Sequence, residues 1–171
     1  EIKTVCITSP TYYGVLSDLP VLANRIHSRG GKLVVDAAHG AHLPFLGYTG
    51  MEAVDIAVVS AHKTLPALGQ TALLLTGKGS GFAHGDLRAA ASLYGSSSPS
   101  YVLMASLDLA RAWMEEEGKT AYEEAARQTA ALRQRFTSLT EDMAPLDPTR
   151  FVLRTGDGFA VLDEASPLAD Y

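Results

Sequence analysis

The stretch Asp55-Ile56-Ala57-Val58-Val59-Ser60-Ala61-His62-Lys63-Thr64 decides the fold, because a short apolar run ends abruptly in a cluster of polar side chains. Such runs, rich in β-branched residues, are typical of strands buried in a sheet. Similar runs precede it at 3–8 and 33–36, and another follows at 70–76. We therefore predict strands over 3–8, 33–36, 55–60 and 70–76.

Helical patterns alternate with these strands. We predict a first helix from a cap at Ser17 to the glycines at 30 and 31, with Pro20 in its first turn. Residues 37–50 read as a loop, and the other helical segments are a turn at 51–54 and helices over 82–92, 101–117 and 119–141. The alternation predicts an α/β fold with a mostly parallel sheet and flanking helices.

The strand at 70–76 is predicted to run against its neighbour. About ten residues separate it from the strand at 55–60, and Pro66 and Gly69 oppose a helix between them. A parallel return needs a crossover of roughly a dozen residues or more. We therefore predict one antiparallel strand, at 70–76.

The chain is predicted to contain one domain and the start of another. Residues 1–145 form the first domain, and Pro145 and Pro148 interrupt the helical pattern at its end. Two short strands are predicted over 150–155 and 158–162, around a Gly-Asp-Gly turn. Residues 146–171 are therefore predicted to begin a small C-terminal subdomain.

Composition excludes several classes of protein. The chain has 171 residues, of which 47% are hydrophobic and 19% charged, so a disordered chain is excluded. The net charge of −5 argues against a nucleic-acid-binding face, and no apolar run reaches the roughly 18 residues that a membrane span needs. Cys6, the only cysteine, is predicted to be a small buried hydrophobe; without an internal disulfide, a cytoplasmic location is favoured.

Polar side chains follow three of the predicted strands at the point where each one ends. Residues 10–14 follow the first, Asp36 and His39 the second, and Ser60, His62 and Lys63 the third. Ligands of open α/β sheets bind outside the carboxyl ends of the strands. We therefore expect these clusters to meet at one edge and to form one site.

The residues at this edge match the needs of an aldehyde cofactor, pyridoxal phosphate. It needs an amine, for which Lys63 is the candidate, and an acid beside its ring nitrogen, for which Asp36 is the candidate. Ser60 and His62 are candidates for phosphate contacts, and His39 for the ring's phenolic oxygen.

Each residue also has an ordinary structural interpretation. A lysine in a loop is usually solvated, and an aspartate at a strand end often only caps a turn. His39 and His42 have the spacing of a metal pair, but they lie in a loop with no third ligand nearby, and we predict no metal site.

Four segments, in order, resemble the bacterial Orn/Lys/Arg decarboxylase family of fold type I pyridoxal-phosphate enzymes. The resemblance covers residues 3–140, and S-x-H-K-T together with D-x-A-H upstream makes it specific. The segments are Ser9-Pro10-Thr11-Tyr12-Tyr13-Gly14, Val35-Asp36-Ala37-Ala38-His39-Gly40-Ala41-His42, residues 60–70 and residues 97–108.

The resemblance implies part of the large domain of a fold type I transferase-like enzyme, with a role for each site residue. Lys63 resembles the Schiff-base lysine and Asp36 the pyridine-nitrogen partner, with Ala38 beneath the ring and His39 beside it. Ser60 and His62 resemble the residues that contact the phosphate. Ser97 and Ser98 match the place where this family reaches into the neighbouring subunit's site, which implies a homodimer.

The implied reaction is decarboxylation of arginine, lysine or ornithine to an amine, a step of polyamine biosynthesis. Two alternatives stay open at this point. One is an aminotransferase-like or other lyase activity with the same lysine and aspartate. The other is a truncated, inactive α/β scaffold or interaction module.

The resemblance also implies that the family's large domain begins before Glu1 and that its small domain continues past Tyr171. We therefore expect the isolated 171-residue chain to bind pyridoxal phosphate poorly, because part of the phosphate cup lies elsewhere. Titration of the cofactor, followed by absorbance, checks this expectation. Tight one-to-one binding would contradict it.

Overall fold

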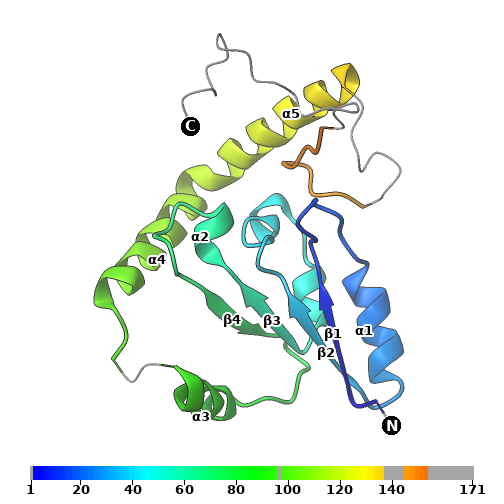
Figure 1. Ribbon diagram of the computed structural model, residues 1–171, viewed down its shortest axis with the longest axis vertical. Helices are drawn as coiled ribbons and strands as arrows, with labels where there is room; N and C mark the ends of the chain where they lie inside the picture. Colours follow the sequence, from blue (N-terminus) through cyan, green and yellow to red (C-terminus); the bar gives the residue numbers. More distant parts are fainter. Residues whose placement is uncertain (1, 96–97, 137–144, 154–171) are drawn as a thin grey trace, which may run out of the picture.

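The computed structural model describes residues 2–95, 98–136 and 145–153, in which one sheet has the strand order β1-β2-β3-β4 (Figure 1). The strands are β1 (Thr4–Thr8), β2 (Lys32–Asp36), β3 (Ile56–Val59) and β4 (Leu73–Thr76). The first three run parallel, and β4 is antiparallel to β3. The first four predicted strands and the reversed direction of the fourth are confirmed.

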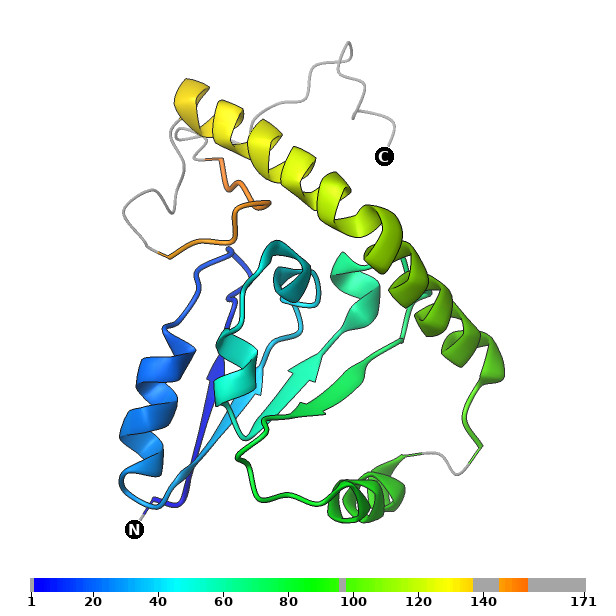
Figure 2. The ribbon, with the colours of Figure 1, turned by 180° about the vertical axis from the view of Figure 1, so that it is seen from behind.

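The helices follow the predicted order. They are α1 (Leu19–His27), α2 (Ala61–Thr64), α3 (His84–Tyr94), α4 (Tyr101–Trp113) and α5 (Lys119–Arg135), with 3₁₀ turns η1 (Leu43–Leu46) and η2 (Gly50–Ala53). A π-helical segment, η3 (Met114–Gly118), joins α4 to α5. The helices predicted over 101–117 and 119–141 therefore join into one helical rod, which Figure 2 shows from behind. The rod ends at Arg135, before the extended Phe136, and residues 137–141 lie outside the described residues.

Three local predictions need correction. Asp18, not Ser17, caps α1: its Oδ1 accepts the N–H of Val21 at 3.1 Å, whereas the N–H of Ser17 donates to the Ser9 hydroxyl. The short helix α2 occupies a segment predicted as loop, since a single turn fits before Pro66 forces the chain to extend. The turn η1 also lies within the predicted loop 37–50.

The two faces of the sheet differ in burial. Residues of β2 and β3 that point to one face are buried with residues of α1 and the two 3₁₀ turns, and this cluster is the core: Leu19, Ala23, Leu33, Val35, Leu43, Met51, Val54, Ala57 and Val59. Side chains alternate along a strand, so Cys6 and Val58 point to the opposite, exposed face. The prediction that Cys6 is buried is therefore wrong.

The segment after α5 returns to the sheet. Leu146 forms an isolated antiparallel bridge with Val15, in the loop after β1. The described residues 150–153 contain no named strand, and the rest of the predicted strands at 150–155 and 158–162 lies outside the described residues. The subdomain predicted over 146–171 remains a prediction. Among the described helices, none is long and apolar enough to cross a membrane.

A buried carboxylate fixes the opposite end of the sheet. The side chain of Asp55 is 1% exposed, and its oxygens lie 2.6 Å from His27 Nε2 and 2.9 Å from Lys32 Nζ. It also accepts the N–H of Leu33 at 2.8 Å. Burial alone would raise the pKa of Asp55, but these hydrogen bonds lower it below the ordinary value of 3.8.

We predict that Asp55→Asn lowers the free energy of unfolding at pH 7 by about 2–3 kcal/mol, because the buried amide has one acceptor oxygen for the three donors that the carboxylate binds. The ionised Asp55 carboxylate stabilises the fold above pH 3.8, and this contribution is lost as the pH falls below it. Urea denaturation at several pH values checks both statements.

Glu52→Gln is the control, since its ion pair with Lys78 is exposed and spans 4.0 Å. It should change the stability by less than about 0.5 kcal/mol. Equal effects of the two substitutions at pH 7 would contradict the role given to Asp55.

Candidate active site

The three parallel strands end at the same edge of the sheet. The N–H of Ser9, after β1, donates to the carbonyl of Asp36 at 3.0 Å, and the N–H of Ala37 donates to the carbonyl of Val58 at 2.8 Å. The loops after β1 and β2 and the short helix α2 therefore start from neighbouring points. The predicted polar clusters meet where parallel pairing requires them to meet.

A groove of about 560 Å³ lies at this edge and runs onto the exposed face of the sheet. Three of the predicted site residues line it, namely Asp36, Ala38 and Ser60. The Oδ1 atom of Asp36 accepts the N–H of Ala38 at 3.0 Å, which orients the carboxylate. A carboxylate, a small side chain and a hydroxyl thus share one surface.

Lys63 and His39 face each other. The Nζ atom of Lys63 lies 3.3 Å from Nε2 of His39. Within the described part of the chain, Lys63 has no carboxylate within 4.0 Å. The His39 ring also meets the Tyr12 ring edge-on, with centroids 5.4 Å apart. An amine without an acidic partner therefore lies beside an oriented imidazole.

Three neighbouring charges and partial burial act on the pKa of His39. Partial burial lowers the pKa of His39, the cations of Lys63 and Arg150 lower it further, and the charge of Asp36 opposes them. His39 is therefore neutral at pH 7, and its Nε2 can accept a hydrogen bond from Lys63.

The other predicted residues do not line the groove: these are Lys63, which lines a separate cavity, His39 and the half-buried His62. The Nδ1 atom of His62 is hydrogen-bonded to the carbonyl of Thr71 at 2.9 Å. Ser98 is exposed, in the connection between α3 and α4, and Ser97 lies outside the described residues. The phosphate and neighbouring-subunit roles of these residues remain predictions.

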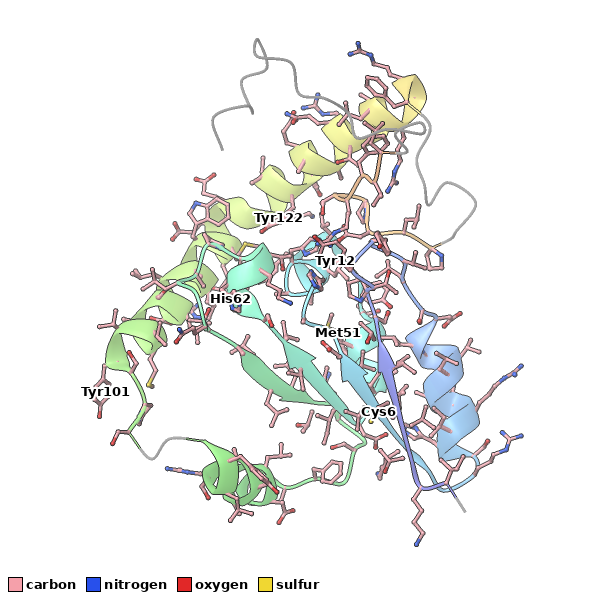
Figure 3. All side chains as sticks on the ribbon, viewed as in Figure 1. Cys6, Tyr12, Met51, His62, Tyr101 and Tyr122 are labelled. Atoms are coloured by element: carbon pink, nitrogen blue, oxygen red, sulfur yellow. The ribbon has the colours of Figure 1, made fainter. Side chains whose placement is uncertain are left out.

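The sequence interpretation missed a second polar cluster beside Lys63. Lys63 lines a cavity of about 390 Å³. The other lining residues come from the segment before η1, from the end of α2, from α5 and from the segment after α5: His42, Thr64, Leu65, Tyr122, Ala125, Thr149 and Arg150. Figure 3 shows Tyr122 and Tyr12 at the same end of the sheet, although they are far apart in the sequence. The Tyr122 hydroxyl donates to the carbonyl of Thr64.

Asp147 holds this cluster together. Its carboxylate is fully buried, 3.1 Å from Nε2 of His42, and accepts the hydroxyl and the N–H of Thr149 at 2.8 and 2.9 Å. The His42 ring stacks on Tyr122 with centroids 5.2 Å apart. Burial alone would raise the pKa of Asp147, but the hydrogen bonds from His42 and Thr149 lower it. The carboxylate therefore stays ionised and ties the returning segment to the site.

A metal site is not found where the two histidines suggested one. In the residues that the structure describes, no group of three or more His, Cys, Asp or Glu side chains is arranged to hold a metal ion. His42 instead binds Asp147. The only sequence signal for this cluster was the run Asp147-Pro148-Thr149-Arg150, whose proline we interpreted only as a helix breaker.

Comparison with known proteins identifies relatives of this chain. Residues 1–157 match the family model described as Orn/Lys/Arg decarboxylase, major domain. The protein YaaO of Bacillus subtilis, which is uncharacterized, is 36% identical over 92% of this chain and 36% of its own length. An arginine decarboxylase of the same organism is 33% identical over 81% of this chain and 29% of its own length.

A solved structure supports the fold. The lysine decarboxylase LdcF of Francisella novicida is similar with a TM-score of 0.57 and 20% sequence identity, over 88% of this chain and 26% of that one. The chain spans about a third of the length of the curated relatives it matches.

We predict that Lys63→Met raises the pKa of His39, because it removes a cation that faces the imidazole. Asp36→Asn should shift it in the opposite direction. Proton NMR titration of the imidazole measures both effects. Lys78→Met, at an exposed turn, is the control and should leave the titration unchanged; an unchanged His39 in Lys63→Met would contradict the site geometry.

Proposed function

The chain belongs to the Orn/Lys/Arg decarboxylase family, and on this premise we propose that it forms part of a pyridoxal-phosphate-dependent decarboxylase. The proposed substrates are arginine, lysine or ornithine, and the products are the corresponding amine and carbon dioxide. The observation that carries the proposal is the amine of Lys63, without an acidic partner among the described residues, 3.3 Å from a histidine that Asp36 also influences.

The residues at the edge of the sheet fit pyridoxal phosphate. Asp36 would hold the ring nitrogen, since its Oδ1 is oriented by Ala38 and the carboxylate lines the groove. Ala38, with its small side chain, leaves room for a flat ring against it. The groove of about 560 Å³ lies within the range of about 300–1,000 Å³ that small-molecule sites occupy. Ser60 offers a hydroxyl on the same surface.

The side chains have separate tasks in the proposed reaction. When bound, pyridoxal phosphate supplies an aldehyde that reacts with amines and a ring that takes up the electrons left when carbon dioxide departs. Lys63 must be unprotonated to bond the aldehyde, and the neutral His39 accepts a hydrogen bond from its Nζ. Asp36 keeps a proton on the ring nitrogen. Ser60 and His62 are proposed to bind the phosphate.

We propose that the protein acts in the cytoplasm, in polyamine biosynthesis, as a homodimer or larger homo-oligomer. Large apolar side chains of α3 and α4 are uncovered: Leu93 is 78% exposed, Tyr94 95% and Tyr101 80%. Exposed apolar groups in such density are typical of an interface. Ser97 and Ser98 lie in the connection between these two helices, and we propose that they reach the neighbouring subunit's site.

Two other functions make different predictions. An aminotransferase-like enzyme or another lyase would use the same Lys63 and Asp36 but release no carbon dioxide from a basic amino acid. An inactive α/β scaffold would bind no cofactor. Decarboxylation is preferred because the curated relatives with an assigned activity are arginine decarboxylases.

We predict that borohydride reduction of the complete gene product with pyridoxal phosphate leaves a phosphopyridoxyl group on the peptide that contains Lys63. Peptide mass spectrometry measures the adduct. Lys63→Ala should abolish it, and Lys78→Ala should not. A wild-type peptide without adduct would support the scaffold alternative.

We predict that Asp36→Asn reduces the release of carbon dioxide from arginine, lysine or ornithine by about a hundredfold or more, because the ring nitrogen loses its proton partner. The amide can still accept the N–H of Ala38, so the loop should keep its shape. Asp108→Asn, on the exposed face of α4, is the control. Turnover of amino acids without loss of carbon dioxide would favour the aminotransferase alternative.

A further inference from the structure

The helical rod formed by α4, η3 and α5 contacts the segment that carries Lys63 at two points. The hydroxyl of Ser106, on α4, accepts the N–H of Leu68 at 2.8 Å. The hydroxyl of Tyr122, on α5, donates to the carbonyl of Thr64, the residue directly after the lysine. Both ribbon views show the rod passing beside α2 (Figures 1 and 2).

The carbonyl of Thr64 needs a partner from outside its own helix. The last four carbonyls of any α-helix lack a donor within the helix, and α2 has only one turn, Ala61–Thr64. A single turn is also unstable on its own, because nucleation of a helix is unfavourable. Tyr122 supplies the missing donor. Burial and the charge of Asp147 raise the pKa of Tyr122, so its hydroxyl is protonated at pH 7 and can donate.

We propose that Tyr122 is a positioning residue for Lys63, which caps α2 from α5 and fixes the direction in which the lysine leaves the backbone. This role rests on the proposed function, in which Lys63 bonds the cofactor. The side chain of Lys63 is exposed, and its hydrogen bond among the described residues, to Nε2 of His39, spans 3.3 Å. The direction of this flexible side chain therefore depends on the backbone of α2.

The π-helical segment η3 turns Tyr122 toward α2. Ser106 and Tyr122 are 16 residues apart. At about 100° per residue, an uninterrupted α-helix would place them about 160° apart, on opposite sides of the rod. A π segment takes up one extra residue in a turn, which reduces this angle to about 60°. Since η3 lies between the two residues, one side of the rod can contact both Thr64 and Leu68.

The ring of Tyr122 is held independently of its hydroxyl. It stacks on the ring of His42, with centroids 5.2 Å apart and an angle of 26° between the planes. His42 in turn binds the buried Asp147. Tyr122→Phe should therefore keep the ring in place and remove the contact to Thr64 alone.

Two conservative substitutions separate positioning from stability. Tyr122→Phe removes the bond to Thr64. Tyr48→Phe is the matched control, because the half-buried Tyr48 donates its hydroxyl to the carbonyl of Ser17 at 3.1 Å. Thermal denaturation of the complete gene product should show similar losses of stability for both. Only Tyr122→Phe should slow formation of the borohydride-reducible adduct on Lys63, by about three- to tenfold, the factor of one hydrogen bond between neutral groups.

A second readout needs no cofactor. The cation of Lys63 lowers the pKa of His39, so a displaced lysine should raise it. We expect Tyr122→Phe to shift the proton NMR titration of His39 in the same direction as Lys63→Met but by less, and Tyr48→Phe to leave it unchanged. A wild type without adduct contradicts the proposed function, whereas this titration still decides the positioning role. Identical His39 titrations in wild type and Tyr122→Phe would overturn that role.

The π segment is tested through its length. Deletion of the exposed Glu116 should convert η3 to an α-helical turn, rotate α5 by about 100° and reproduce both effects of Tyr122→Phe. Glu116→Ala keeps the number of residues and should have neither effect. A deletion variant that folds, as verified by circular dichroism, and retains wild-type adduct formation and His39 titration would overturn the proposal. Should the deletion variant not fold, Tyr122→Phe alone decides.

Discussion

Parallel pairing of β1, β2 and β3 is the constraint on which the site depends. The register places Thr8 beside Asp36 and Asp36 beside Val58, so three loops leave the sheet from adjacent positions. As a result, Asp36 and His39 lie in the loop after β2, and Lys63 lies on α2, directly after the neighbouring strand β3. The buried core on one face stabilises the register, since a slip of one residue would turn Leu33 and Val35 outward.

The antiparallel β4 has a consequence for the same site. Because it returns directly after α2, the segment that carries Lys63 is short and anchored at both ends. His62 hydrogen-bonds the carbonyl of Thr71, just before β4, and Tyr122 from the long helical rod hydrogen-bonds the carbonyl of Thr64. The π segment at Met114–Gly118 sets the rotation with which α5 presents Tyr122. The backbone that carries Lys63 is therefore fixed by β3 before it, by the segment that leads into β4 and by α5.

The sequence predicted the local features well and the long-range ones poorly. Strands were visible as apolar runs, and the direction of β4 followed from the ten residues before it, because both depend on neighbours in the chain. The bond between His42 and Asp147 joins residues 105 apart, and no periodicity signals such a pair. Cys6 was misjudged because an apolar strand does not reveal which of its faces is covered. The contacts of Asp147 were missed because they form only when the segment after α5 returns to Gly14.

The central claim is that Lys63 and Asp36 contact opposite sides of one pyridine ring. A crystal structure of the complete gene product grown with pyridoxal phosphate measures this most directly. Our account predicts continuous density between the cofactor and Nζ of Lys63, with a carboxylate oxygen of Asp36 within hydrogen-bond distance of the ring nitrogen. A cofactor bound elsewhere, or a ring nitrogen facing away from Asp36, would contradict it.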